Sequence, residues 1–419
     1  MEVFVMDDGI RLVRPNRDQL LLQPCHLDEL LPADHAARTI WSVVERLDVS
    51  AFYDTIAARG TDPGRPALDP RLLISLWLYA TQEGVGSGRE LARRCEFHDA
   101  YRWLCGGLSV NYHTLNDFRV AHEDKLDNLF TEILATLIHH GVVRVDHISQ
   151  DSMRVRASAG SGSFRSRDGL KRTLGEVRLH VEKVKRQMDL PADSKRRRLE
   201  AAEARVRRIE AALETLEDLQ GAKDRRKDKS SKRRPSRVSM TDPDARVMRM
   251  ANGGFSPAYN MQFATDPHSR AIVGVFVTTA GNDHHAGEPM RRQVERRTKR
   301  KVRVHLMDGD YVNLEAIERA EQSGVRIYAP PRRPKRAASG TTVRASDGPG
   351  VARWRRRMAT ESAQRRYRTR ASTSETVHAD FKAHRGLTGV RVRGLSKVTC
   401  VALWAGLLYN VLHFAEHLL

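Results

Sequence analysis

The hydrophobic periodicity of the chain changes near residue 140, and this change constrains the fold more than any other feature. Before it, apolar residues recur at helical spacing, as in the segment that Asp69 and Pro70 open with a cap and a first-turn proline. After it, short runs rich in Val, Ile and aromatic residues predict strands: VVRVDHIS, YNMQFAT, AIVGVFVTT, KVRVHLMD and GVRIYAP. The sequence therefore predicts an all-α region over residues 1–140 and a mixed α/β region over residues 141–419.

The connections between these runs predict how the strands pair. Turns such as Asp266-Pro267-His268-Ser269 separate the first three runs, which favours an antiparallel meander. The last two runs alternate with helical stretches, EPMRRQVERR and NLEAIERAEQSG, which favours parallel strands with crossovers. We therefore expect one mixed sheet with helices on its faces.

An insertion over residues 165–240 separates the first strand from the second. Two apolar seams within it step by three and four residues, from Leu174 to Met188 and from Leu199 to Leu216, and residues 190–194 form a turn between them. This pattern predicts an antiparallel helical hairpin, followed by a basic tract from Lys223 to Arg237. Pairing within one chain is the simpler interpretation, and a dimerisation arm is the alternative.

The N-terminal region is predicted to consist of short helices joined by glycine-containing turns. We expect helices over RLLISLWLYATQ, GRELARRCEF and HDAYRWLCG, and a fourth from Asn111 or Thr114 to the Gly141 stop. Arginines are scattered among them: Arg89, Arg93, Arg94, Arg102 and Arg119. These features suit a helix-turn-helix-like DNA-binding module, and they suit a helical cap with solvated arginines equally well.

The charge of the chain points to a polyanionic partner. It carries 72 Lys plus Arg against 52 Asp plus Glu, a net charge of +20. Nucleic acid is the first candidate, and a membrane surface is the alternative. The most apolar stretch, Val398 to Val411, is shorter than a membrane span, and the N-terminus lacks the features of a signal peptide. We therefore expect a cytoplasmic protein, and the scattered cysteines indicate neither disulfides nor a zinc site.

Three carboxylates stand where a two-metal phosphoryl-transfer site would need them. We expect Asp151 to close the strand that begins at Val142, Asp308 to follow a strand, and Glu375 to lie on a helix that begins near Ala359. Two Mg²⁺ ions about 3.5 to 4 Å apart can activate the attacking oxygen and stabilise the leaving one, and hard cations prefer carboxylate ligands.

Each of these assignments has an alternative. Asp151 could be an ordinary turn-capping residue, and Asp146 competes with it as the acid of the first strand. Asp310 could replace Asp308, because residues two apart point to the same side of an extended chain. A single Glu is usually a surface acid, so Glu375 is the weakest of the three when taken alone.

The residues around Glu375 resemble a known family. Tyr367, Arg370, Glu375 and Lys382 resemble the Y-R-E-K signature of insertion-sequence DDE transposases of the IS four and IS five superfamily. QDSMRVRAS resembles the first-Asp segment of that family, although Ser-Met replaces the common Gly-Thr. The segment from GRPALDPRLL to YRWLCGG resembles its N-terminal helical domain, and the insertion is similar to that of the branch with a helical hairpin.

The resemblance implies an RNase H-like catalytic core and a DNA transposase. It implies that Asp151, Asp308 and Glu375 hold two Mg²⁺ ions, which Mn²⁺ could replace. The residues expected to contact DNA near the scissile phosphate are Tyr367, Arg370 and Lys382, to which we add the basic Arg154 beside the first acid. The expected partners are transposon terminal inverted repeats and target DNA, bound by a homodimer on paired ends in the bacterial cytoplasm, in association with the nucleoid.

Two other functions fit the same residues. One is a metal-dependent nuclease that does not transfer strands. The other is an inactive transposase-derived protein that only binds DNA, and the intact set of three acids argues against it.

Overall fold

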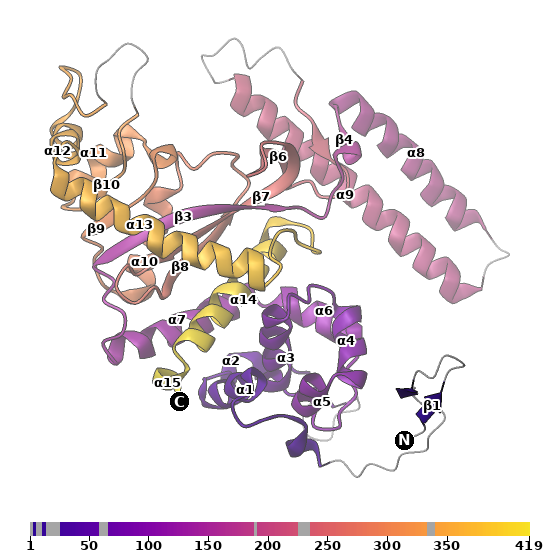
Figure 1. Ribbon diagram of the computed structural model, residues 1–419. Coiled ribbons are helices and arrows are strands. Elements are labelled where there is room, and N and C mark those ends of the chain that lie inside the picture. The colour runs from indigo at the N-terminus through magenta and orange to yellow at the C-terminus, as the bar shows by residue number, and fades with distance from the viewer. Residues whose placement is uncertain are drawn as a thin grey trace.

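A mixed sheet lies beside a group of N-terminal helices, and a helical hairpin projects away from both (Figure 1). The computed structural model describes residues 3–5, 11–13, 26–57, 66–187, 191–224, 235–332 and 340–419. The overall class is mixed α/β with a mainly helical N-terminal part, as the periodicity predicts. The expectation of a purely α N-terminal region is wrong in one respect, because β1 (Val3–Val5) and β2 (Arg11–Val13) form an antiparallel ribbon there.

The N-terminal helices begin where the sequence places their caps. They are η1 (Leu27–Leu30), α1 (Ala36–Arg46), α2 (Ser50–Tyr53), α3 (Pro70–Gln82), α4 (Gly88–Phe97), α5 (Asp99–Cys105), α6 (Tyr112–Ala121) and α7 (Glu123–His139). The Asp69 side chain accepts a hydrogen bond from Arg71 N at the start of α3, and Asn111 caps α6 in the same way. The single helix expected between Asn111 and Gly141 is instead broken at His122, whose ring packs edge-on against Phe52 and Phe118.

The sheet has the strand directions that the connections predict. Its order is β10 (Arg326–Tyr328), β9 (Val304–Leu306), β3 (His147–Arg156), β7 (Phe255–Thr265) and β6 (Arg246–Arg249), with β8 (Ile272–Thr278) also pairing with β7. β7 is antiparallel to β3 and β8, whereas β9 is parallel to β3 and β10. Strand β6 is an addition that the sequence pattern does not predict.

The first sheet strand lies later in the chain than expected. β3 begins at His147 rather than Val142 and continues to Arg156, so Asp151 lies in the middle of the strand and does not close it. The physical reason is the backbone of Val145, whose φ of 65° is incompatible with an extended strand. Val143 and Val145 are buried all the same, which explains why their segment has the composition of a strand.

The two faces of the sheet are covered by different helices. Gly274 of β8 faces α10 (Gly287–Thr298), because a Cβ on it would lie 2.4 Å from the Met290 sulfur. The next residue, Val275, faces α14 (Leu395–His413) and lies in register with Phe263 and Asp151. We call the side that carries Asp151 the α13 face, after α13 (Glu361–Ala379), which packs on β3, and the other side the α10 face.

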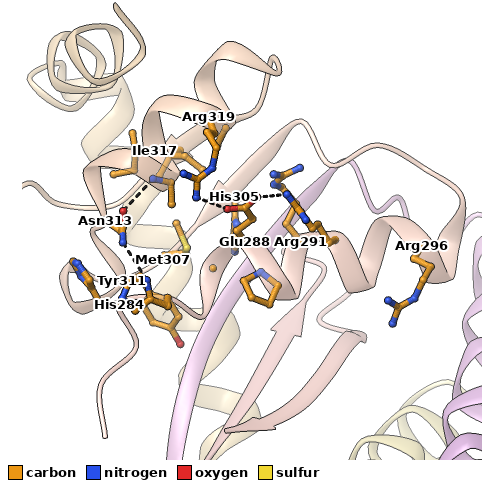
Figure 2. A pocket seen from close by; sticks show the side chains of 17 residues that line it. His284, Glu288, Arg291, Arg296, His305, Met307, Tyr311, Asn313, Ile317 and Arg319 are labelled. Atoms are coloured by element: carbon orange, nitrogen blue, oxygen red, sulfur yellow. Dashed lines mark hydrogen bonds and ion pairs between the residues drawn. The ribbon is translucent and has the colours of Figure 1, made fainter. Parts of the chain in front are cut away.

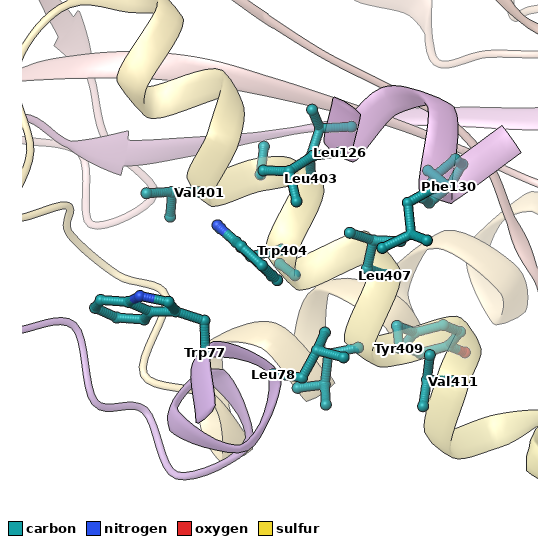
Figure 3. Packing of buried hydrophobic residues seen from close by; sticks show 14 of the residues in the cluster. Trp77, Leu78, Leu126, Phe130, Val401, Leu403, Trp404, Leu407, Tyr409 and Val411 are labelled. Carbon is teal, nitrogen blue, oxygen red and sulfur yellow. The ribbon is translucent and has the colours of Figure 1, made fainter. Parts of the chain in front are cut away.

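Helix α14 joins the N-terminal helices to the sheet. It packs against α3, α6, α7 and β8, and Trp404, Leu403 and Leu407 lie in one continuous buried cluster with residues of all of them (Figure 3). The Asn410 side chain bonds both the amide and the carbonyl of Ile272 in β8, at 2.9 and 2.8 Å. These contacts give the N-terminal helices and the sheet a shared core.

The same helix is long and apolar enough to cross a membrane by length and composition. The expectation that no stretch reaches that length is therefore wrong for α14. Of its most apolar window, 72% is buried inside the protein, and the core helix of a soluble protein meets the same criteria.

The insertion forms the antiparallel hairpin that its apolar seams predict. α8 (Arg167–Arg186) and α9 (Ala192–Asp224) bury Val177, Ile209 and Leu216 against each other. Ion pairs join Arg178 to Glu210 and Arg167 to Glu217 across the pair, at 2.8 and 2.7 Å. At its base, η2 (Ser161–Ser163) leads into β4 (Phe164–Arg165), which pairs with β5 (Val238–Ser239). Residues 225–234, the middle of the basic tract, lie outside the described residues. The sequence also predicts a second basic segment from Arg332 to Arg370, of which residues 333–339 lie outside the described residues.

The remaining helical elements follow β9 in the chain, and the first of them cover the β9 and β10 end of the sheet. They are η4 (Gly309–Tyr311), α11 (Leu314–Gln322), α12 (Pro349–Met358), the π-helical turn Asp380–His384 and α15 (Ala415–Leu418). Helix α12 packs against α11, α13 and β10 around the buried Trp354. This second cluster supports the loop that follows β9.

Close packing of α14 generates a stability prediction. A Cβ on Gly406 would lie 3.0 Å from Phe130 and 3.1 Å from Val275, whereas a Cβ on Gly175, in the exposed middle of α8, would meet nothing within 4 Å. We expect Gly406→Val to lower the free energy of unfolding by about 1–3 kcal/mol because it overpacks the core. Gly175→Val should be neutral or slightly stabilising, because glycine is the poorer helix former. Urea denaturation followed by circular dichroism measures both, and equal effects would contradict the packing argument.

Candidate active site

Asp151 lies on the α13 face of β3 and is paired with a cation. Its Oδ2 is 3.0 Å from Arg370 Nη1 and 3.7 Å from His378 Nδ1, and its Oδ1 accepts a hydrogen bond from Ser152 N at 2.9 Å. The Asp151 and Arg370 side chains are 17% and 13% exposed, so this pair is largely shielded from water. Burial opposes the charge of Arg370, yet the proximity of Asp151 and Tyr367 raises its pKa, so the guanidinium stays charged.

Asp308 reaches the same face from the end of β9. Since Leu306 pairs with Ser149, two residues before Asp151, the alternation of side chains directs Asp308 to the Asp151 side. It caps the short helix 309–311 by accepting a hydrogen bond from Asp310 N at 2.5 Å. Burial raises the pKa of Asp308, and the charges of Asp310 and Asp151 raise it further, while Arg370 lowers it. Two carboxylates and one guanidinium therefore share this site.

Helix α13 presents a polar stripe to the strand that carries Asp151. Arg370, Ser374 and His378 are four residues apart, so they lie on one face of the helix. Ser374 Oγ is 3.0 Å from Ser149 Oγ, which fixes the helix against β3. Burial lowers the pKa of His378, so its ring is neutral near Asp151 and is not the partner that balances the carboxylate charge.

The other residues of the predicted site lie around this pair without joining it. Glu375 is exposed on α13, and Lys382 is exposed on the π-helical turn that follows that helix. Tyr367 is half-buried, with the Arg370 guanidinium 5.9 Å from its ring centre. Among the described residues, no three carboxylate, imidazole or thiol groups are close enough to share a metal ion. The structure thus brings Asp151, Asp308 and Arg370 together, and leaves Glu375 outside.

Arg154 lies on the opposite side of the sheet. Ser152 and Arg154 alternate with Asp151 and face the α10 side, where Asp283 accepts a hydrogen bond from Ser152 Oγ at 3.1 Å and lies 3.6 Å from Arg154 Nη2. Asp283 is 3% exposed and also accepts from Asn260 and Gln262, at 2.7 and 2.6 Å. Arg154 is therefore part of a buried polar network behind Asp151 and not a neighbour of its carboxylate.

The polar network behind the sheet also holds the loop that carries Asp308. Tyr311, at the end of the short helix 309–311, donates a hydrogen bond from its hydroxyl to Gln262 Oε1 at 2.6 Å. Gln262 lies on β7, in register with Ser152 of β3. The loop after β9 is thereby fixed to the strands that position Asp151.

A large cavity lies nearby, on the α10 face. Its volume is about 720 Å³, and its walls come from α10, α11, the end of β9 and the loop before α10 (Figure 2). Two of the arginines that line it, Arg319 and Arg292, share the single carboxylate of Glu288, at 2.8 and 2.5 Å. Burial lowers the pKa of His305, at its floor, to about 3, so that ring is neutral. Since Asp151 and Asp308 face the other way, this cavity is not the site of the carboxylates.

The donor set at Asp151 and Asp308 suits a hard divalent cation. Both groups are carboxylates, the ligands that Mg²⁺ prefers, and the charge of one raises the pKa of the other. A cation between them would relieve that repulsion, and Arg370 supplies the only guanidinium recorded beside both within the described residues. The residues present therefore fit such an ion with two ligands from this conformation.

Sequence reasoning missed three features of this site. His378 was recognisable from the i, i+4, i+8 spacing that it shares with Arg370 and Ser374. The buried Asp283 follows a turn-like Gly281-Asn282, and nothing in the local pattern distinguishes it from a surface acid. The Tyr311 contact joins residues 49 positions apart and has no local signal.

Two parts of the chain match known protein families. Residues 25–121 match a family described as a transposase domain (DUF772), and residues 228–411 match the transposase DDE domain. The second match contains Asp308 and Glu375, whereas Asp151 precedes it. No curated protein and no solved structure matches the chain. The two family matches, one on the N-terminal helices and one on the sheet region, together support a DDE transposase.

Proposed function

We propose that the protein is a DNA transposase that cleaves DNA at transposon ends and transfers the freed strand into target DNA, on an RNase H-like core. The observation that carries this proposal is the convergence of Asp151 and Asp308 on one face of adjacent parallel strands, beside Arg370. This convergence lies in a chain that matches a transposase DDE domain.

The site would work with a divalent cation, Mg²⁺ or in its place Mn²⁺. Asp151 and Asp308 would hold the cation, and Glu375 would be the third ligand and would hold a second ion. When bound, such ions polarise a phosphoryl oxygen and lower the pKa of a bound water or hydroxyl. For Glu375 to take part, its side chain must turn from its exposed position on α13 toward Asp151.

The chain's own residues would orient the DNA and balance the charge of the carboxylates. Arg370 balances the charge of Asp151 and could instead contact a phosphate oxygen near the scissile bond, since a guanidinium binds carboxylates and phosphates by the same geometry. Tyr367 and the exposed Lys382 would contact the neighbouring backbone. Arg154, on the α10 face, could reach DNA only from the other side of the sheet.

The remaining assignments follow from this function. Residues 1–140 would form a DNA-binding helical domain and residues 141–419 the catalytic domain, with residues 165–240 as an inserted hairpin and basic tract. The substrates would be terminal inverted repeats and target DNA, bound by a homodimer on paired ends in the bacterial cytoplasm, at the nucleoid.

The decisive test is a reaction with the DNA that flanks the gene. The full-length protein is incubated with linear DNA carrying the flanking inverted repeats, a supercoiled target plasmid and Mg²⁺. We expect cleavage at the repeat ends and joining of the 3′ ends to the plasmid, both abolished by EDTA. Cleavage without joined product would indicate a nuclease, and binding without cleavage would indicate an inactive DNA-binding protein.

Substitution of Asp308 tests the first ligand pair. Asp308→Asn keeps the capping oxygen but removes the negative charge, so we expect cleavage to fall by about 100-fold or more while DNA affinity is retained. Asp310→Asn is the matched control, because Asp310 is exposed and pairs with Arg332 at 3.2 Å. If Asp310→Asn and not Asp308→Asn abolished cleavage, the second acid of the loop would be the ligand.

Glu375 needs a separate test because the structure leaves it outside the carboxylate pair. We expect Glu375→Gln to reduce cleavage about as strongly as Asp308→Asn, again by about 100-fold. Glu361→Gln, an exposed acid in the first turn of the same helix, should leave the rate unchanged. Normal cleavage by Glu375→Gln would remove it from the site and leave the two aspartates as the acids of the reaction.

A further inference from the structure

A second, smaller cavity lies where the N-terminal helices meet the loop that follows α13. Its volume is about 350 Å³, within the range of ligand pockets, and its walls come from the α3–α4 turn at residues 84–86, from Arg119 of α6 and from residues 385–391. Gly84 has a φ of 65°, and a Cβ on it would lie 3.2 Å from the Arg385 carbonyl oxygen. Glycine at this position therefore allows the two segments to approach.

The loop that forms the far wall is held in place by the sheet. Arg156 N donates a hydrogen bond to the Thr388 carbonyl at 3.1 Å, and Val390 N donates to the Arg156 carbonyl at 2.8 Å. These bonds extend the β3 edge just beyond the strand that carries Asp151. The cavity is thus preformed between two anchored segments.

A buried guanidinium lines this cavity. Arg119 is 8% exposed and lies over the Trp77 ring, 4.6 Å from its centre. Its Nη1 donates a hydrogen bond to the Gly86 carbonyl at 2.7 Å, while its Nε is buried without a partner. The other guanidinium donors of Arg119 therefore lack acceptors within the part of the chain that the structure describes.

Within the described part of the chain, no carboxylate balances the charge of Arg119. The described residues that line the cavity include three arginines and no acid. Arg385 is neutralised by Asp380, at 3.2 Å, but Arg391 is exposed and makes no recorded ion pair with a described residue. Burial, and then the charge of Arg391, lower the pKa of Arg119 to about 10, so it remains protonated at neutral pH. Burial raises the pKa of the Cys400 thiol to about 12, so that thiol stays protonated and supplies no negative charge.

Arg119 and Arg391 line one cavity, and none of its described lining residues is an acid. A buried, unpaired charge is unfavourable, and an oxyanion that accepts hydrogen bonds from both groups would relieve the desolvation and the repulsion together. We propose that this cavity binds a phosphate-type oxyanion between Arg119 and Arg391, and that the oxyanion is a backbone phosphate of bound DNA. The identification of the oxyanion as a DNA phosphate rests on the proposed transposase function, whereas the binding of an oxyanion does not.

The position of the cavity favours a DNA phosphate over a free ion. The loop 385–391 directly follows the π-helical turn that carries Lys382, and α13 before it carries Arg370. Residues 84–86 and Arg119 lie in the part of the chain that matches the transposase domain, and residues 385–391 lie in the part that matches the transposase DDE domain. A phosphate held here would fix the DNA to both regions at once, close to the carboxylate face.

The binding of inorganic phosphate to the full-length protein tests the site itself. Phosphate replaces chloride at constant ionic strength, and the melting temperature is measured. We expect phosphate to raise the melting temperature of the wild type by roughly 1–3 °C more than chloride does. Arg391→Gln should lose most of that shift, and Arg393→Gln, two residues away and outside the cavity, should keep it. Arg391 is exposed, so its substitution should leave the fold intact.

A second variant places a counter-charge inside the cavity. Thr388 is exposed and lines the wall opposite Arg119, so Thr388→Glu should supply a carboxylate to the guanidinium groups. We expect this variant to melt at least as high as the wild type in chloride and to show no further response to phosphate. Equal phosphate shifts in the wild type, Arg391→Gln and Thr388→Glu would overturn the proposal, as would no shift in the wild type.

Salt-dependent DNA binding then identifies the source of the phosphate. If a DNA phosphate occupies the cavity, Arg391→Gln should reduce the slope of log affinity against log salt by about 0.9, the value of one contact. An unchanged slope together with the lost phosphate shift would assign the cavity to a free oxyanion instead. The melting measurements do not depend on DNA cleavage, so failure of this site and failure of the transposase function are distinguishable.

Discussion

The burial of α14 is the interaction on which the rest of the structure depends. An apolar helix of 19 residues, close to the end of the chain, lies between the N-terminal helices and β8, with Gly406 in contact with Phe130 and Val275. Its polar residue Asn410 completes the hydrogen bonding of Ile272 in β8, and its Trp404 donates to the Arg119 carbonyl in α6. Both regions that match transposase families therefore share a core that the last long helix completes.

The strand register turns this shared core into a site. Because side chains alternate along a strand, the pairing of Asp151 with Phe263 and of Ser149 with Leu306 places Asp151 and Asp308 on one face. Helix α13 covers that face and brings Arg370 to the carboxylates. A shift of β3 by one residue would turn Asp151 toward the α10 face. The contacts of Ser152 and Arg154 with the buried Asp283 therefore also protect the register.

The sequence predicts the elements of this fold better than it predicts their contacts. Helix caps at Asp69 and Asn111, the two strand directions and the helical hairpin are local patterns, and all are present in the structure. The early start assigned to β3 failed because Val145 adopts a positive φ despite the strand propensity of valine. The ring contact of His122 with Phe52 at the helix break, and those of Phe381 in the π-helical turn with Phe263 and Tyr409, likewise join residues distant in sequence.

The same distinction holds at the site. The position of Asp308 after a strand was predictable because a strand end and a following loop are readable from composition, whereas Arg370 was singled out only by the family resemblance of the residues around it. The pairing of Arg370 with Asp151 joins residues more than two hundred positions apart, and the exposure of Glu375 depends on the rotation of α13 about its axis. Neither the ion pair nor the exposure of Glu375 is encoded in a local sequence pattern.

The hairpin gives the protein a long lever. Between Leu216, which lies in one cluster with Val238 of β5, and its first residue Ala192, α9 extends roughly 36 Å beyond the two-stranded base formed by β4 and β5, at about 1.5 Å per residue. A tilt of about 10° at that base moves the far end by roughly 6 Å, about one helical turn. The tilt of the narrow base, rather than the helices themselves, therefore determines where the tip can make a contact relative to the sheet.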